Sequence, residues 1–370
     1  MPHCSGSGTL YRWVSAERLA SAVMIRMASS AQARSPEWTT CGKSAALTGT
    51  SLLGGRLLVG VADVPPESVP ALFSLWWGVA GERVDGHRVC LMDQEFPVTI
   101  APADVHDLDP DKLVLLDVRW KLGDPLGREK YLMGHLPAAV FVDMETDLAG
   151  PASPEDGRHP LPDLESFQAA ARRWGINDGD TVVVYDNSGS MAAARAWWLL
   201  RAHGHADTRI LDGGLMAWVQ EDFPIEKDEV VLPAGNVTLR PLADDAAITI
   251  DQAAEWPADG ILLDARAGER FRGETEPIDP RAGHIPGAVS APTTENVDED
   301  GLFLEPEALR ERFAGLGVEP GSRVAVYCGS GVTAAHEVAA LALAGIDATL
   351  YPGSFSQWSH DASREVATGE

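Results

Sequence analysis

The chain has 370 residues, 45% hydrophobic and 23% charged, which is the composition of a globular protein large enough for two domains. Its formal net charge is −26, and so acidic a protein repels phosphate backbones, which argues against a nucleic-acid partner. The chain has no uncharged apolar stretch of about 18 residues, which argues against a transmembrane helix and a membrane partner.

Residues 1–91 differ in composition from the rest of the chain. They are rich in Ser, Gly and Ala, have weak periodicity, and carry eight basic against six acidic residues. They also hold three of the four cysteines, Cys4, Cys41 and Cys90. We predict a poorly patterned N-terminal extension. It loosely fits a mitochondrial-type leader, but a start codon set too early is the favoured explanation, because Met92 opens the acidic, well-patterned part.

From about residue 110 onward, short apolar runs alternate with helical patterns. Strands are predicted over 113–117, 139–142, 181–185 and 209–211, and helices over 164–174 and 192–201. Continuous apolar runs are typical of strands buried on both faces, and strands that alternate with helices form parallel sheets. The sequence therefore predicts an α/β fold with a parallel sheet flanked by helices.

This pattern occurs twice. Four segments recur in the same order, at offsets of 147, 149, 142 and 140 residues. The matched pairs are 115–117 with 262–264, 134–139 with 283–288, 181–186 with 323–328, and 212–218 with 352–358. A repeat this long indicates domain duplication. We predict one domain over 92–228, a linker rich in Pro and acidic residues over 229–246, and a second domain over 247–370.

Cys328 is the single cysteine of residues 92–370, which excludes a disulfide scaffold and favours a cytoplasmic enzyme. It ends the apolar run 323–328 and opens a Gly-containing loop before the helical pattern of 333–344. Loop amides and the N-terminus of a helix favour a thiolate over a thiol. Gly329 and Gly331 allow a tight loop, and Thr333 is expected to cap the helix. This placement predicts a nucleophile.

The position that matches Cys328 in the first repeat is Asp186. A carboxylate cannot carry transferable sulfur, so the first domain is predicted to be chemically silent at its own loop and to support the second. A metal site is not expected either, since His203 and His205 have no further ligand nearby.

With these motifs, the chain resembles the two-domain rhodanese-like sulfurtransferases, most closely the 3-mercaptopyruvate sulfurtransferases. The likeness covers about residues 110–360. It rests on the loop 328–334 (CGSGVTA), the segments 270–274 (RFRGE) and 283–287 (GHIPG), and the first-domain segments 194–198 (ARAWW) and 212–214 (DGG). The resemblance implies tandem rhodanese-like domains, no cofactor, and a sulfur carried as a cysteine persulfide.

The resemblance also implies roles for single residues. Cys328 would carry the persulfide, and Ser330 would relay a proton. Arg270 would bind the donor carboxylate, as a guanidinium suits that group. Arg281 is the nearest candidate for a second such arginine, although its spacing differs from the family pattern.

His159 would join the cleft from the first domain. Glu145 stands where the family has an aspartate, which puts a Cys–His–acid relay in question. The amides of the loop would hold the substrate, and the residues concerned are Gly329, Gly331, Val332 and Thr333. The donor would be 3-mercaptopyruvate, and the acceptor a thiol, such as thioredoxin, or cyanide.

Four other functions can be compared with this interpretation. A thiosulfate:cyanide sulfurtransferase is disfavoured because Gly329 and Ser330 put no cation in the loop. A rhodanese-like phosphatase needs an arginine six positions after the cysteine, where Ala334 stands. A non-catalytic binding module fits the first domain but not the second, and a thioredoxin-type oxidoreductase is excluded because no Cys-x-x-Cys occurs.

Overall fold

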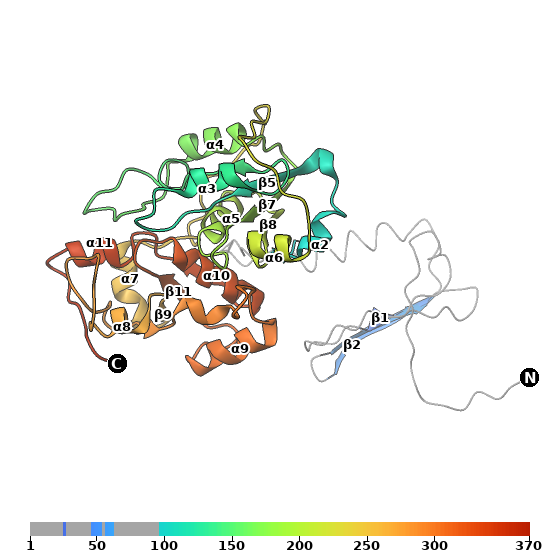
Figure 1. The fold of residues 1–370 in the computed structure, drawn as a ribbon. Coiled ribbons are helices and arrows are strands. Elements are labelled where there is room, and N and C mark those ends of the chain that lie inside the picture. The colour runs from blue at the N-terminus through green and yellow to red at the C-terminus, as the bar shows by residue number, and fades with distance from the viewer. Residues whose placement is uncertain (1–24, 27–45, 54–55, 63–95) are drawn as a thin grey trace, which may run out of the picture. The chain divides into compact units, whose positions relative to one another are not determined.

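The computed structural model describes residues 25–26, 46–53, 56–62 and 96–370 (Figure 1). The chain forms two units, Met1–His87 and Arg88–Glu370, each described here by itself. None of the helices described is long and apolar enough to cross a bilayer.

The first unit contains an antiparallel sheet in the order β1-β3-β2. Its strands are β1 (Ile25–Arg26), β2 (Ala46–Leu53) and β3 (Arg56–Ala62). The three cysteines of the N-terminal extension lie outside the described residues, as does most of the segment on which the leader and start-codon hypotheses rest.

The second unit begins with a five-stranded sheet in the order β4-β8-β7-β5-β6, in which every neighbouring pair is parallel. The strands are β4 (Thr99–Ile100), β5 (Leu113–Asp117), β6 (Val140–Phe141), β7 (Thr181–Tyr185) and β8 (Thr208–Leu211). The helices are α2 (Pro102–Val105), η3 (Pro110–Lys112), α3 (Gly127–Met133), α4 (Leu164–Arg173), α5 (Ala193–Ala202) and α6 (Gly214–Gln220).

A four-stranded parallel sheet follows, in the order β10-β9-β11-β12. Its strands are β9 (Ile261–Asp264), β10 (Val289–Ser290), β11 (Val324–Tyr327) and β12 (Ala348–Leu350). The helices are α7 (Ile250–Glu255), η4 (Trp256–Ala258), α8 (Gly268–Phe271), η5 (Thr293–Asn296), α9 (Pro306–Gly315), α10 (Thr333–Leu343) and α11 (Ser354–His360).

The two sheets confirm the predicted duplication. The order β8-β7-β5-β6 of the first sheet corresponds to β12-β11-β9-β10 of the second, and the first sheet has β4 as an additional edge strand. The expected α/β class is confirmed as well, since both sheets are parallel and flanked by helices. The domain boundaries at residues 91, 228 and 246 stay predictions.

Helices α5 and α10 pack against each other between the two sheets (Figure 1). Every residue of α5 is buried, and so are nine residues of α10. A helix that is apolar on all sides is stable only when it is covered on all sides, and here each helix has its own sheet on one side and the other helix on the other. Because α5 and α10 begin at the loops that follow β7 and β11, this packing brings the two loops together.

Helix α10 also carries a buried imidazole. His336 is fully buried, its Nδ1 atom lies 2.7 Å from the hydroxyl of Thr293, and its ring stacks on Phe303 at 4.6 Å between centroids. Burial lowers the pKa of His336 from 6.5 to about 3, so the folded protein holds this side chain neutral.

The pH dependence of stability tests this burial. The folded-state pKa lies below 6.5, so the unfolded chain takes up the proton first as the pH falls, and stability present above pH 6.5 is lost below it. Between pH 7 and pH 5, His336 should cost the wild-type protein about 2 kcal/mol of unfolding free energy, a loss that a His336→Gln variant lacks. Urea unfolding at both pH values measures the difference, and an identical pH dependence of the two proteins would contradict the assignment.

Candidate active site

Cys328 directly follows β11 and opens a five-residue loop that ends where α10 begins. Its side chain is 1% exposed, and the amide of Gly331 donates a hydrogen bond to its Sγ atom at 3.1 Å. Gly331 has φ +81°, and a Cβ atom there would lie 2.4 Å from the carbonyl oxygen of Pro352. Only glycine fits this position, so the turn that aims an amide at the sulfur depends on it.

The start of α10 differs from the expectation in one respect. The prediction that Thr333 caps the helix is wrong, because Thr333 is its first helical residue and no side chain caps the preceding Val332 position. The amides of the first turn are therefore not taken up by a capping side chain.

The matching loop of the first domain is filled by its own carboxylate. Asp186 follows β7, is fully buried, and accepts hydrogen bonds from four backbone amides at 2.7 to 3.0 Å. The donors are the amides of Ser188, Ser190, Ala192 and Ala193. The loop before α5 is two residues longer than the loop before α10, so, counted from the helix starts, the amides of Ala192 and Ala193 correspond to those of Val332 and Thr333. The first domain thus shows how such a loop binds an anion.

Two residues from different domains meet beside the cysteine. The Nδ1 atom of His159 lies 2.7 Å from Oγ of Ser330, and its Nε2 atom lies 3.2 Å from Oε1 of Glu145. The indole of Trp120 donates to the same Glu145 oxygen at 2.9 Å. The structure therefore assembles a serine–histidine–carboxylate chain in which glutamate stands in the acidic position.

The environment of His159 keeps it neutral. Burial lowers the pKa of His159 below 6.5, while the neighbouring Glu145 carboxylate opposes that shift. A neutral imidazole has one nitrogen that accepts and one that donates, so it can pass a proton in either direction between Ser330 and Glu145.

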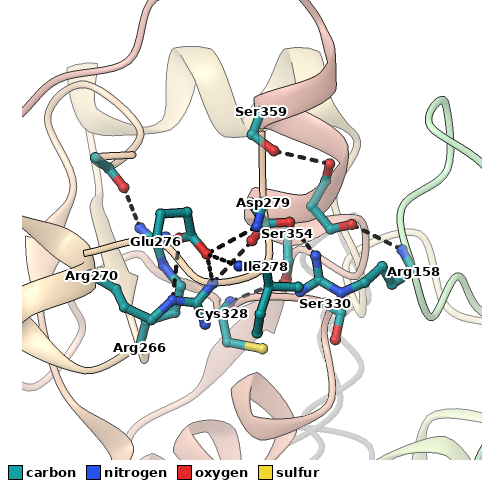
Figure 2. Close-up of polar contacts among 12 residues, drawn as sticks. Arg158, Arg266, Arg270, Glu276, Ile278, Asp279, Cys328, Ser330, Ser354 and Ser359 are labelled. Atoms are coloured by element: carbon teal, nitrogen blue, oxygen red, sulfur yellow. Dashed lines mark hydrogen bonds and ion pairs between the residues drawn. The ribbon is translucent and has the colours of Figure 1, made fainter. Parts of the chain in front are cut away.

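Two arginines lie close to the residue after the cysteine, and both pair with Asp279 (Figure 2). Arg270 of α8 pairs through Nη2 with Glu276 at 2.6 Å and with Asp279 at 3.1 Å, and Arg158 of the first domain also pairs with Asp279. A Cβ atom on Gly329 would lie 3.1 Å from Nη2 of Arg158 and 3.4 Å from Nη1 of Arg270. Glycine at this position leaves room for both guanidinium groups at the mouth of the loop.

Arg281, the candidate for the second substrate arginine, has a different environment. Its guanidinium donates four hydrogen bonds of 2.7 to 2.8 Å to backbone carbonyls at the end of α11 and beyond. The acceptors are the carbonyls of Trp358, Ser359, Asp361 and Arg364. These bonds close the C-terminal end of a helix and use most of the donors of the side chain. The structure thus engages Arg281 at the end of α11 and has Arg158 beside Arg270, so a substrate-binding role for Arg281 stays a prediction.

The sequence interpretation gave no role to two residues that reach the loop, Arg158 and Arg195. Arg158 directly precedes His159, so its place in the cleft follows once the histidine is placed there. Arg195 belongs to the first-domain segment 194–198, and its Nη1 atom donates to the Gly331 carbonyl at 3.0 Å. A buried arginine inside a helix as apolar as α5 was the signal that could have singled it out.

Comparisons with known proteins agree with this architecture. A family model described as a rhodanese-like domain matches residues 101–221 and 249–361. A Mycobacterium tuberculosis protein named as a thiosulfate sulfurtransferase, SseB, is 49% identical over 266 residues, covering 70% of this chain and 92% of the relative. A Pseudomonas aeruginosa protein named as a 3-mercaptopyruvate sulfurtransferase is 46% identical over 271 residues, covering 71% and 94%.

Among solved structures, that of SseA from Escherichia coli, described as a 3-mercaptopyruvate sulfurtransferase, superimposes with a TM-score of 0.62 at 34% sequence identity. The match covers 70% of this chain and 98% of the SseA chain.

The contact between His159 and Glu145 can be tested by titrating the imidazole. The NMR titration midpoint of His159, assigned with a His159→Asn variant, should lie below 6.5. Because Glu145 opposes the lowering, a Glu145→Gln variant should move the midpoint further down. Glu155→Gln, on the same segment, serves as the control and should leave it unchanged. An unchanged or higher midpoint in Glu145→Gln would show that the two side chains do not interact.

Proposed function

The chain belongs to the rhodanese-like domain family and is a sulfurtransferase, and from this premise we propose that it moves sulfur from 3-mercaptopyruvate through a persulfide on Cys328 to a thiol or cyanide acceptor. The observation that carries the proposal is the convergence on one loop of a buried cysteine, a neutral serine–histidine pair and two arginines. The cysteine can attack the donor sulfur, the arginines can bind the donor carboxylate, and the serine–histidine pair can protonate the enolate that leaves.

The first half-reaction begins with the proton of the Cys328 thiol. Neutral His159 takes it up by way of Ser330, and the amides of the loop favour the resulting thiolate. The thiolate attacks the donor sulfur, so a sulfur–sulfur bond forms and the carbon–sulfur bond of the donor breaks. The electron pair of that bond stays on carbon as the enolate of pyruvate, and the proton held by His159 returns through Ser330 to give pyruvate.

In the second half-reaction an acceptor attacks the outer sulfur of the persulfide. The sulfur–sulfur bond breaks, Cys328 leaves as the thiolate, and the outer sulfur departs on the acceptor, as thiocyanate when cyanide is used. Two half-reactions through a covalent intermediate predict ping-pong kinetics.

The charge at the mouth of the loop favours a monocarboxylate donor over dianionic thiosulfate. Arg158 and Arg270 are offset by the carboxylates of Glu276 and Asp279, and the two loop residues after the cysteine are uncharged. Nε of Arg158 is buried and has no hydrogen-bond partner in the described part of the chain, so this guanidinium has a donor to spare. We therefore propose that the donor carboxylate binds between Arg158 and Arg270.

Thiosulfate is the second candidate donor, because the Mycobacterium tuberculosis relative is named for it. The two donors differ in their leaving groups. Sulfite leaves thiosulfate without needing a proton, whereas the enolate of pyruvate has to be protonated. Removal of the thiol proton by the relay therefore serves both donors, whereas the return of that proton is needed for 3-mercaptopyruvate alone.

Comparing the two donors in three proteins tests the donor and the relay together. Wild-type protein should show a higher kcat/KM for 3-mercaptopyruvate than for thiosulfate, and Cys328→Ser should abolish both activities. Ser330→Ala should lower the 3-mercaptopyruvate rate by about 100-fold, the usual scale of acid–base catalysis, and the thiosulfate rate by a smaller factor, because thiosulfate does not need the proton returned. A preference for thiosulfate, or an equal loss with both donors, would overturn the assignment.

A series of arginine variants tests the carboxylate site. Arg158→Gln and Arg270→Gln should each raise KM for 3-mercaptopyruvate by about tenfold with little change in kcat, because each loses one charged hydrogen bond to the donor. Arg281→Gln is the matched control and should leave KM unchanged while lowering the melting temperature, since its bonds close the end of α11.

The same variants should be assayed with mercaptoacetone, which lacks the carboxylate. Its KM should be insensitive to the loss of Arg158 or Arg270. A rise in KM with Arg281→Gln, or an equal rise with mercaptoacetone, would show that the carboxylate binds elsewhere.

A further inference from the structure

Arg195 links the two domains from a fully buried position. It lies in α5, is 0% exposed, and donates hydrogen bonds to four backbone carbonyls from both domains. Three of them, those of Leu148, His159 and Pro160, belong to the first domain, at 3.1 to 3.4 Å. The fourth is the carbonyl of Gly331 in the cysteine loop, at 3.0 Å.

All of these partners are neutral, so the charge of Arg195 is not balanced by a carboxylate. Among the ion pairs of residues 96–370, none includes Arg195. Burial lowers the pKa of Arg195 to about 10, which leaves it cationic at neutral pH, and Cys328 is the charged partner that opposes this shift. A buried charge without a counter-ion is costly, and the sulfur anion is the group placed to balance it.

The hydrogen bond to Gly331 also orients a peptide. A trans peptide holds its carbonyl and its amide in opposite directions, and the described chain contains no cis peptide. While Arg195 holds the Gly331 carbonyl, the Val332 amide of the same peptide therefore points the other way. In the first domain the matching amide, that of Ala192 directly before α5, donates to the Asp186 carboxylate at 2.8 Å. Arg195 thus aims the Val332 amide at the position that the sulfur occupies.

The duplication provides an internal comparison. Arg195 is the third residue of α5, and the third residue of α10, 140 positions later, is Ala335, which is also 0% exposed. The offset within these helices is 140 because the loop after β7 is two residues longer than the loop after β11. The second repeat therefore has no cation at this position, and the buried cation of the first repeat reaches the loop that carries the cysteine.

We propose that Arg195 is a positioning residue for Cys328, which holds the Gly331–Val332 peptide in place and sets a buried cation beside the sulfur anion. This inference rests on Cys328 as the sulfur carrier. The other charged or titratable groups around the loop are Glu145, Arg158, His159, Arg270, Glu276 and Asp279, and a substitution at Arg195 changes the charge of none of them by itself.

The experiment measures the alkylation of Cys328 by iodoacetamide between pH 5 and pH 10, quantified by mass spectrometry of the Cys328 peptide. Arg195→Gln keeps a donor for the Gly331 carbonyl and removes the charge, Arg195→Lys keeps the charge, and Glu337→Gln, which removes another buried charge on α10, is the control. Near-UV circular dichroism verifies that each variant is folded.

In Arg195→Gln the alkylation of Cys328 at pH 7 should be about tenfold slower than in the wild type, because the thiolate loses the neighbouring cation. Arg195→Lys should regain most of the rate, and Glu337→Gln should match the wild type. A wild-type curve in Arg195→Gln, or an equal shift in Arg195→Lys and Glu337→Gln, would overturn the proposal.

A second measurement leaves Arg195 intact, in case its variants do not fold. Cys328→Asp places a carboxylate near Arg195, at the loop position that Asp186 occupies in the first domain. Cys328→Asn is the neutral variant of the same size. The Asp variant should have the higher unfolding free energy at pH 7, and the reverse order would contradict the proposal. Neither measurement uses a sulfur donor, so failure of the donor assay alone would overturn the proposed function and leave this inference standing.

Discussion

The packing of α5 against α10 is the constraint on which the rest of the site depends. Both helices are buried on every side, and each starts at the loop that ends a central strand of its own sheet. Holding them together places side chains of the first domain on the loop of the second: His159 reaches Ser330, and Arg195 reaches the Gly331 carbonyl. The first domain lacks a nucleophile of its own, but it completes the chemistry of its neighbour.

The duplication shows how one loop geometry serves two purposes. In the first domain the loop closes on the carboxylate of Asp186, which accepts four amides and leaves no reactive group. In the second domain a thiol takes the same position, with one amide already on its sulfur. The thiol is reactive where the carboxylate is not, and we infer that Arg195 of the first domain supplies part of the stabilisation of its thiolate.

Much of the fold was predictable from the sequence, because short apolar runs indicate strands buried on both faces and their repetition indicates a second domain of the same fold. The strands at 113–117 and 181–185 match β5 and β7 residue for residue. The site was predictable where a motif fixed a residue relative to a strand end, as for Cys328. The site was not predictable where it depends on the direction of a side chain. Arg281 lies in the expected stretch of sequence, but its side chain donates to carbonyls at the end of α11. Arg158 comes from the other domain, and spacing within one domain carries no information about it.

The central claim is that Cys328 carries the sulfur between donor and acceptor, and intact-mass analysis tests it most directly. Protein mixed with 3-mercaptopyruvate in the absence of an acceptor should gain the mass of one sulfur atom and release one pyruvate. Peptide mapping should place the sulfur on Cys328, and added cyanide should remove it as thiocyanate. Pyruvate release without the mass gain, or a gain mapped to another cysteine, would contradict the account.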